Sequence, residues 1–248
     1  SEELRYETVQ LHNYPEGQIR MTGHPHYDRY LKGPTRSKEQ FFADFKLDHK
    51  RPFILFAPGG DKIIQYNDTD VYALEILREL GHQVLVRYPP GEDIHLIDAK
   101  GWPNYVVFDK PGQRFSARPK DLEIRREDDD NLIDELYYSS LVVTGPTSIP
   151  LDAALFDRPS IIADIYPTGR NIYGKGWGYL LDHIHKLFET GGVWHVESKE
   201  DFIKAVEAYL KNPSLHKEGR AEIRQRWFSY ADGRASERLA FEILRELK

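Results

Sequence analysis

The residues best suited to chemistry form a short turn near the middle of the chain. Gly145, Thr147 and Ser148 follow the apolar run 141–144, which predicts a strand, and they open a predicted helix. The first turn of a helix carries unpaired N–H groups and the positive end of the helix dipole, so it attracts anions, and two hydroxyls add donors. The pattern therefore favours a phosphate or pyrophosphate site. The structural alternative is that Thr147 or Ser148 only caps the helix.

Three further residues are candidates for the same site. Asp152 lies one helical turn beyond the hydroxyl pair, where an acid can accept hydrogen bonds from a ribose, although an acid there also complements the helix dipole. Arg87 ends an apolar strand, and Gly59 follows another. Because parallel sheets bind ligands at the carboxyl ends of their strands, we expect Arg87 and Gly59 to contact the same anion. Scattered surface arginines are the alternative.

A loop near the N-terminus also gathers polar residues. Residues 22–28 place Gly23, His24, His26 and Asp28 within seven positions, a pattern too irregular for a helix or a strand. A His-x-His pair is a candidate metal site, but neither an H-E-x-x-H motif nor a carboxylate cluster accompanies it. We therefore expect a shaped loop without a metal.

A second polar segment opens the last predicted helix. Asp232 or Ser236 is the expected cap, and Arg238 is directed back toward the turn. The structural alternative is a capped helix with a surface ion pair, which contributes about 0–1 kcal/mol.

The hydrophobic pattern predicts the elements that position these residues. From Pro52 onward, short apolar runs alternate with amphipathic stretches, which is typical of parallel strands joined by crossover helices. We expect an α/β fold: a Rossmann-like parallel sheet of about six strands flanked by helices, with the loops after Ala57, Arg87 and Thr144 at one edge. The predicted strands are 53–57, 83–87, 105–108, 122–124, 141–144 and 160–165, and the predicted helices are 71–80, one capped by Asp130, one ending at Phe156, 180–189, 201–210, 214–230 and 235–247.

The predicted organisation is one domain with an N-terminal extension. Residues 1–50 are charged and read as a linker with a first helix, whereas residues 51–248 form the Rossmann-like domain. The acidic run 127–130 indicates a solvated loop that leads into a capped helix. Because the chain begins with Ser1 and its single methionine is Met21, we expect it to be a piece of a longer protein.

Composition excludes several classes of protein. The 248 residues carry a net charge of −6, the wrong sign for binding nucleic acid through bulk electrostatics. The absence of cysteine excludes disulfides, thiolate metal sites and cysteine nucleophiles, and fits a reducing compartment. No apolar run is long enough to span a membrane, and no signal peptide is recognised. We expect a soluble, cytoplasmic protein.

Three segments together resemble the C-terminal domain of GT-B-fold glycosyltransferases, and most closely the CDP-glycerol glycerophosphotransferase-like group of surface-carbohydrate biosynthesis. Residues 22–28 resemble the family's T-G-x-P-R-x-D motif, with His26 in place of the arginine. Residues 132–159 resemble its helix, strand, hydroxyl-pair and helix unit. Asp232-Gly233 with Ser236-Glu237-Arg238 resembles its closing D-G-x-x-S-x-R.

The resemblance implies a domain that binds a nucleotide-activated donor for glycosyl or glycerophosphate transfer. It implies that Thr147 and Ser148 hold the donor phosphates, that Asp152 lies near the ribose, and that Ser236 or Arg238 closes the site. It also implies an acceptor-binding N-terminal domain or partner chain, absent here, through which the protein can associate peripherally with a membrane.

No residue of the chain is assigned as the catalytic base. The family's histidine after the second strand is replaced by Arg87-Tyr88-Pro89, and its other catalytic histidine belongs to the N-terminal domain. No D-x-D motif supports a metal, so we expect no metal and no cofactor. Two alternatives stay open: a nucleotide-sugar 2-epimerase, whose usual hydroxyl-glycine-glycine turn is missing here, and a catalytically silent nucleotide-binding module.

Overall fold

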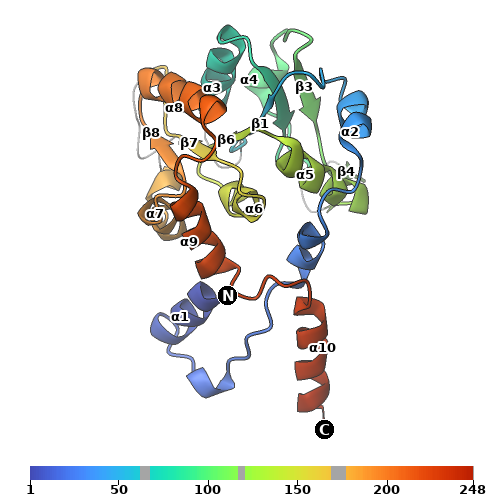
Figure 1. Ribbon diagram of the computed structural model, residues 1–248, viewed down its shortest axis with the longest axis vertical. Coiled ribbons are helices and arrows are strands. Elements are labelled where there is room, and N and C mark those ends of the chain that lie inside the picture. Colours follow the sequence, from blue (N-terminus) through green and yellow to red (C-terminus); the bar gives the residue numbers. More distant parts are fainter. Residues whose placement is uncertain (62–67, 117–120, 169–176, 248) are drawn as a thin grey trace.

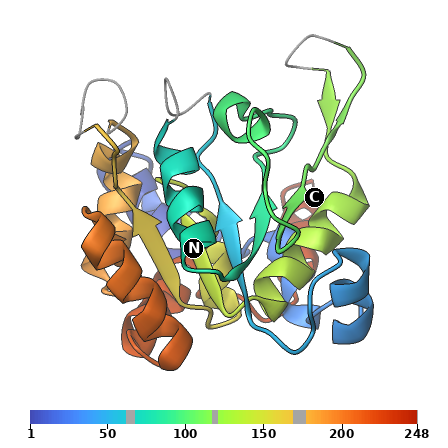
Figure 2. The same cartoon turned by 90° about the horizontal axis from the view of Figure 1, so that it is seen from above.

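A parallel, doubly wound sheet forms the centre of the computed structural model, which describes residues 1–61, 68–116, 121–168 and 177–247. The strands lie in the spatial order β3-β2-β1-β6-β7-β8 (Figures 1 and 2). They are β1 (Phe53–Ala57), β2 (Gln83–Arg87), β3 (Val106–Asp109), β6 (Leu141–Thr144), β7 (Ser160–Ala163) and β8 (Trp194–Val196). The predicted α/β class and the six-stranded parallel sheet are confirmed.

The sheet is buried on both faces because its strands are mainly apolar, and the polar residues Gln83, Arg87 and Thr144 at strand ends are buried with them. In β1, Ile54 and Phe56 pack on one face, whereas Phe53 and Leu55 pack on the other. The first face is covered by α3 (Asp68–Glu79), α4 (His95–Asp98) and α8 (Lys199–Lys211). The opposite face is covered by α2 (Lys38–Asp44), α5 (Arg126–Tyr138), α6 (Ile149–Leu155), α7 (Asp182–Glu189) and α9 (Lys217–Trp227). Two-sided burial explains why the strands read as continuous apolar runs.

Residues 1–50 contain more structure than one helix. They form α1 (Glu2–Gln10), the short 3-10 turns η1 (Glu16–Gln18), η2 (Pro25–Asp28) and η3 (Tyr30–Lys32), and α2. Tyr30, Phe41 and Phe42 are buried in the core beside β1 and α5. The extension is therefore packed on the sheet domain rather than hanging free of it.

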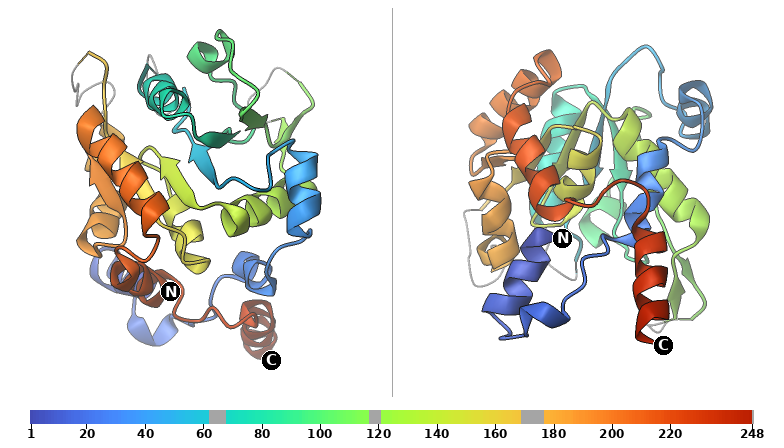
Figure 3. Two further views of the ribbon diagram at one scale, coloured as in Figure 1. Left: turned by 45° about the horizontal axis from the view of Figure 1, so that its top comes forward. Right: turned by 60° about the horizontal axis from the view of Figure 1, so that its bottom comes forward.

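One helix projects away from the sheet. In Figure 3, α10 (Ala235–Glu246) extends from the bottom of the molecule, where α1 also lies. Its contacts are made mainly with η2, and Ile243, Leu244 and Leu247 leave their apolar side chains exposed. None of the helices in the described part of the chain is long and apolar enough to span a membrane.

Three predicted elements need correction. Leu122–Glu123 (β5) pairs antiparallel with Gln113–Arg114 (β4) outside the main sheet, because two residues cannot form a central strand. The sixth strand is instead β8, only three residues long and therefore missed. Helix α5 begins at Arg126 rather than after Asp130, so the acidic run is helical: the N–H of Arg125 donates to Asp128 over 2.8 Å, and acids are stable in a first turn.

Candidate functional site

A cavity of about 300 Å³ opens where the strand order reverses. The chain winds outward from β1 to β3 on one side and from β6 to β8 on the other, so the switch point lies between β1 and β6. Such a switch point is where doubly wound sheets bind ligands. The lining comes from α5 and from the loops after β1, β2 and β6: Ala57, Pro58, Gly59, Arg87, Tyr88, Pro89, Pro90, Ile124, Asp129, Leu132, Thr147 and Ile149. The predicted convergence of these three loops is confirmed.

The walls of this cavity are mainly apolar. Tyr88, Ile124, Leu132 and Ile149 supply rings and aliphatic chains, and few polar groups interrupt them. A small number of polar groups on an apolar wall is typical of a site for a small organic ligand. A second cavity of about 570 Å³ between residues 29–35 and α5 receives no residue from the strand-end loops, so we place the candidate site in the first.

The hydroxyl turn is fixed by its own hydrogen bonds. Thr144 donates its hydroxyl proton to the carbonyl of Ala57 over 2.7 Å, and its oxygen lies 2.8 Å from Oγ1 of Thr147. Thr147 is therefore the donor of that second bond, because Thr144 has one proton. Its oxygen also accepts from the N–H of Ile149 over 3.3 Å. Thr147 thus shapes the turn, and its proton is already used.

Ser148 is the hydroxyl that stays available in this turn. It is the exposed N-cap of α6, and its side chain makes no capping bond. The helix itself offers few donors: Pro150 has no N–H, and the N–H of Leu151 bonds to the carbonyl of Ser148 over 2.9 Å. The predicted anion contact therefore depends on Ser148 more than on the helix start.

The glycines beside this turn shape the cavity, but their N–H groups are not available to a ligand. An added Cβ on Gly145 would lie 3.7 Å from the nitrogen of Gly59, so the two loops are in contact. The N–H groups of Gly59 and Gly60 donate to the two carboxylate oxygens of buried Asp70, over 3.1 and 3.0 Å. Gly60 must be glycine, since its φ is +83° and an added Cβ would lie 2.9 Å from Pro89. The N–H of Gly59 is thus already used by Asp70.

Arg87 lines the cavity, but its charge is compensated within the protein. Its guanidinium lies 2.6 Å from Asp109 and 3.2 Å from Glu135, and it donates to the carbonyl of Asp128 over 2.8 Å. Burial raises the pKa of Glu135 well above its usual range. Arg87 therefore links β2 to β3 and α5, and a bound phosphate would have to compete with two carboxylates for it.

Asp152 is not among the residues that line the cavity. It is buried within α6, with the hydroxyl of Tyr27 as its hydrogen-bond partner, and burial raises its pKa from 3.8 to about 7. The partner belongs to η2, so Asp152 joins the N-terminal loop to α6. In the structure Asp152 therefore has a protein partner, Tyr27. Its contact with a ribose stays a prediction.

The two polar segments near the ends of the chain contact each other. Asp28 accepts hydrogen bonds from the N–H groups of Ala235 and Ser236, over 3.0 and 2.8 Å, and from the Ser236 hydroxyl over 2.7 Å. Asp28 thereby caps α10. The predicted cap of this helix was Asp232 or Ser236, which is wrong because the acid comes from a segment 207 residues earlier in the chain.

Arg238 closes the same junction from the other side. Its guanidinium donates to the carbonyl of Thr22 over 2.9 Å and to that of Tyr230 over 2.8 Å, and it pairs with Asp232. Gly23 has φ +80°, and an added Cβ would lie 3.1 Å from the Tyr230 carbonyl. Ser236 and Arg238 therefore hold α10 against residues 22–28, and neither lines the cavity.

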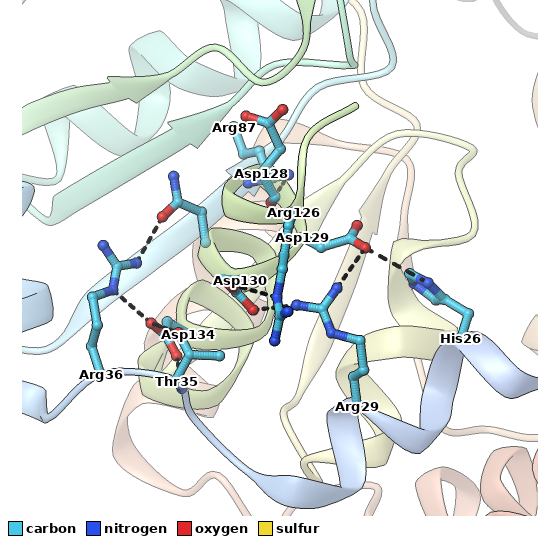
Figure 4. A network of polar contacts seen from close by, with 11 residues as sticks. His26, Arg29, Thr35, Arg36, Arg87, Arg126, Asp128, Asp129, Asp130 and Asp134 are labelled. Carbon is cyan, nitrogen blue, oxygen red and sulfur yellow. Dashed lines mark hydrogen bonds and ion pairs between the residues drawn. The ribbon is translucent and has the colours of Figure 1, made fainter. Parts of the chain in front are cut away.

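The two histidines of the N-terminal loop contact different residues. His24 packs its ring 4.9 Å from that of Tyr27, and burial lowers its pKa. His26 lies 3.9 Å from the carboxylate of Asp129, which also pairs with Arg29 at 3.1 Å (Figure 4). Asp129 lines the cavity, so the loop reaches the site through His26 and Arg29.

One group of side chains in the described part of the chain has the spacing of metal ligands. Asp164, His195 and Glu197 place one ligand atom each within 4.8 Å of one another, at the ends of β7 and β8. The sequence signal for this group is the His-x-Glu pair at 195–197, whereas Asp164 falls within the predicted strand 160–165 and gives no separate signal. None of the three lines the cavity.

Fold and site together define the class of this chain. It is a doubly wound, Rossmann-like α/β domain with a ligand-sized cavity at its topological switch point. The chain belongs to the CDP-glycerol:poly(glycerophosphate) glycerophosphotransferase family, whose model matches residues 2–245. A search of curated protein sequences finds no significant match.

Solved structures share the fold at low sequence identity. The wall teichoic acid polymerase TagF superposes with a TM-score of 0.58 at 17% identity, over 98% of this chain and 55% of that one. S. aureus MnaA in complex with UDP gives 0.62 at 16% identity, over 98% and 58%. The UDP-GlcNAc 2-epimerase from Methanocaldococcus jannaschii gives 0.51 at 16% identity, over 88% and 58%. The chain thus spans little more than half the length of these proteins.

Proposed function

We propose that this chain is the donor-binding half of a GT-B-type glycerophosphotransferase and that its switch-point cavity binds a CDP-glycerol-class donor. The observation that carries the proposal is the cavity itself, which is surrounded by the loops after β1, β2 and β6. Ser148 lies in the chain between the lining residues Thr147 and Ile149, and its exposed side chain makes no capping bond. Membership in the glycerophosphotransferase family supports the choice of donor.

The proposed reaction is a phosphoryl transfer without a metal. The oxygen of an acceptor hydroxyl forms a bond to the phosphorus that carries glycerol, the bond from that phosphorus to the bridging oxygen breaks, and CMP leaves with the electron pair. Ser148 donates a hydrogen bond to the diphosphate as negative charge builds on it. The proton of the acceptor hydroxyl goes to a base outside this chain.

Acceptor binding is assigned to a further domain or a partner chain. The solved structures of similar fold are nearly twice as long as this chain. Among the described residues that line the cavity there is no histidine, and the one carboxylate, Asp129, is paired with Arg29. We propose that the transferase works in the cytoplasm, where nucleotide-activated donors are made, and that any peripheral membrane association comes through that further part.

A thermal-shift screen tests the proposal. The chain is heated with CDP-glycerol, CDP, UDP-N-acetylglucosamine, GDP- and ADP-linked sugars, each at high concentration. A ligand at 100 times its Kd stabilises the folded state by about 2.7 kcal/mol. CDP-glycerol should give the largest shift; a shift with UDP-N-acetylglucosamine alone would favour the epimerase alternative, and no shift with any nucleotide would refute the proposal.

A further inference from the structure

The cavity wall carries one carboxylate among the described residues, and it is Asp129. Asp129 lies in the first turn of α5, and the other lining residues of that wall are apolar, hydroxylated or, in the case of Arg87, already paired with acids. Its side chain is 27% exposed, so it faces solvent-accessible space rather than the core. This residue belongs to the acidic run that the sequence alone assigned to a solvated loop.

Contacts from the N-terminal loop fix the orientation of this carboxylate. Arg29 donates to Oδ2 over 3.1 Å, and His26 Nδ1 lies 3.9 Å from the same oxygen (Figure 4). Oδ1 has no hydrogen-bond donor among the residues that the structure describes. One oxygen is therefore held in place, and the other is left to accept bonds from a ligand.

The charge of Asp129 limits which part of a ligand can lie beside it. Asp128 and Asp130 flank it, so a phosphate at this wall would be repelled, whereas Arg29 already neutralises part of the charge and makes an added cation unnecessary. Neutral hydrogen-bond donors fit best. Two adjacent hydroxyls can both donate to one carboxylate, and hydrogen bonds to charged groups are the stronger ones.

We propose that Asp129 recognises a vicinal diol of the donor and so orients it, with the diphosphate toward Ser148 and the diol toward α5. This proposal rests on the proposed function. Both the ribose and the glycerol of a CDP-glycerol-class donor carry a vicinal diol, so the chemistry has two sources. In this proposal Asp129 makes the kind of contact that the sequence assigned to Asp152, because Asp129 lines the cavity whereas Asp152 does not and is hydrogen-bonded to Tyr27.

The test compares Asp129→Asn with Asp130→Asn. Asp130 pairs with the same Arg29 but does not line this cavity, so the second variant removes an equal charge from the same cluster. Affinities for CDP-glycerol, CDP and 2′,3′-dideoxy-CDP are measured by titration calorimetry. Unfolding midpoints of both variants are recorded, and they should agree, since each variant loses one carboxylate partner of Arg29.

The expected result is an affinity for CDP-glycerol at least about tenfold lower in Asp129→Asn and unchanged in Asp130→Asn. If the same loss appears with CDP but not with dideoxy-CDP, the ribose supplies the diol; if it appears with CDP-glycerol alone, the glycerol does. Equal losses in both variants, or an equal loss with all three ligands, would overturn the inference. A native chain that binds none of the ligands would instead refute the proposed function.

Discussion

Replacing Asp152 with asparagine should stabilise the protein, and the gain should grow with pH. Burial raises the pKa of this carboxyl from 3.8 to about 7 in the folded chain. Between those values the folded state holds a proton that the unfolded state releases, so the free energy of unfolding falls as pH rises through this window. Above about pH 7 both states are ionised and the loss is complete.

The magnitude follows from the size of the shift. About three pKa units at 1.36 kcal/mol each give a cost of about 4 kcal/mol at pH 8, and the same group costs less than about 1 kcal/mol at pH 4. Asparagine cannot ionise, has nearly the same volume, and keeps an oxygen that accepts from Tyr27. Asp152→Asn should therefore gain up to about 4 kcal/mol at pH 8 and little at pH 4.

Urea unfolding of both proteins at pH 4, 6 and 8 measures this difference. Asp182→Asn is the control, because Asp182 is an exposed acid that pairs with Lys186 over 3.3 Å, and its removal should change stability by less than about 1 kcal/mol. Nucleotide affinity of Asp152→Asn should match that of the native chain. Equal stability of native chain and variant across the pH range, or weaker nucleotide binding by the variant, would refute the reasoning.

Three other substitutions test the structural assignments. Arg87→Met should destabilise the protein by about 3–5 kcal/mol in urea unfolding, because buried Glu135 loses its partner; an unchanged stability with lost nucleotide binding would restore the phosphate role. Gly219→Ala should cost about 1–3 kcal/mol, because its Cβ would lie 2.3 Å from the backbone of Gly191, and Gly101→Ala, in a loop with open space around it, is the control for adding a methyl group without a clash. Asp28→Ala should cost about 0.5–2 kcal/mol and speed amide exchange in the first turn of α10 without changing nucleotide affinity; unchanged exchange would contradict its role as the cap.

The sheet was predictable because local sequence determines most of it. β1, β2 and β6 are short runs of buried, mainly apolar residues that end at turn residues, so their boundaries agree with the predicted runs. The weaker elements were missed for physical reasons: β8 has three residues, too few for a periodic signal, and β5 has only two residues, which pair antiparallel with the two residues of β4.

The candidate site was predictable in outline but not in its partners. Topology alone brings Gly59, Arg87 and Thr147 to one cavity, since parallel strands end at the same edge. Which of them keeps a free donor depends on neighbours far away in sequence, such as Asp109 and Glu135 on Arg87. Sequence patterns describe faces and turns, but they do not show these long-range pairings.

The interlocked ends of the chain show the same limit. The sequence predicts a loop at residues 22–28 and a capped helix at residues 232–238, without a signal that joins the two segments. The structure joins them through Asp28 and Arg238. A cap supplied from the other end of the chain has no local signal, so only the folded structure reveals it.

Titration of the native chain with CDP-glycerol in EDTA tests the central claim most directly, with Ser148→Ala and Thr147→Ala measured beside it. The proposed site predicts binding by the native chain in the presence of the chelator. It predicts a loss on the order of 1–3 kcal/mol of binding free energy in Ser148→Ala, whose hydroxyl is unused, and a smaller loss in Thr147→Ala, whose proton is bonded to Thr144. Binding abolished by EDTA, or an unchanged affinity in Ser148→Ala, would contradict it.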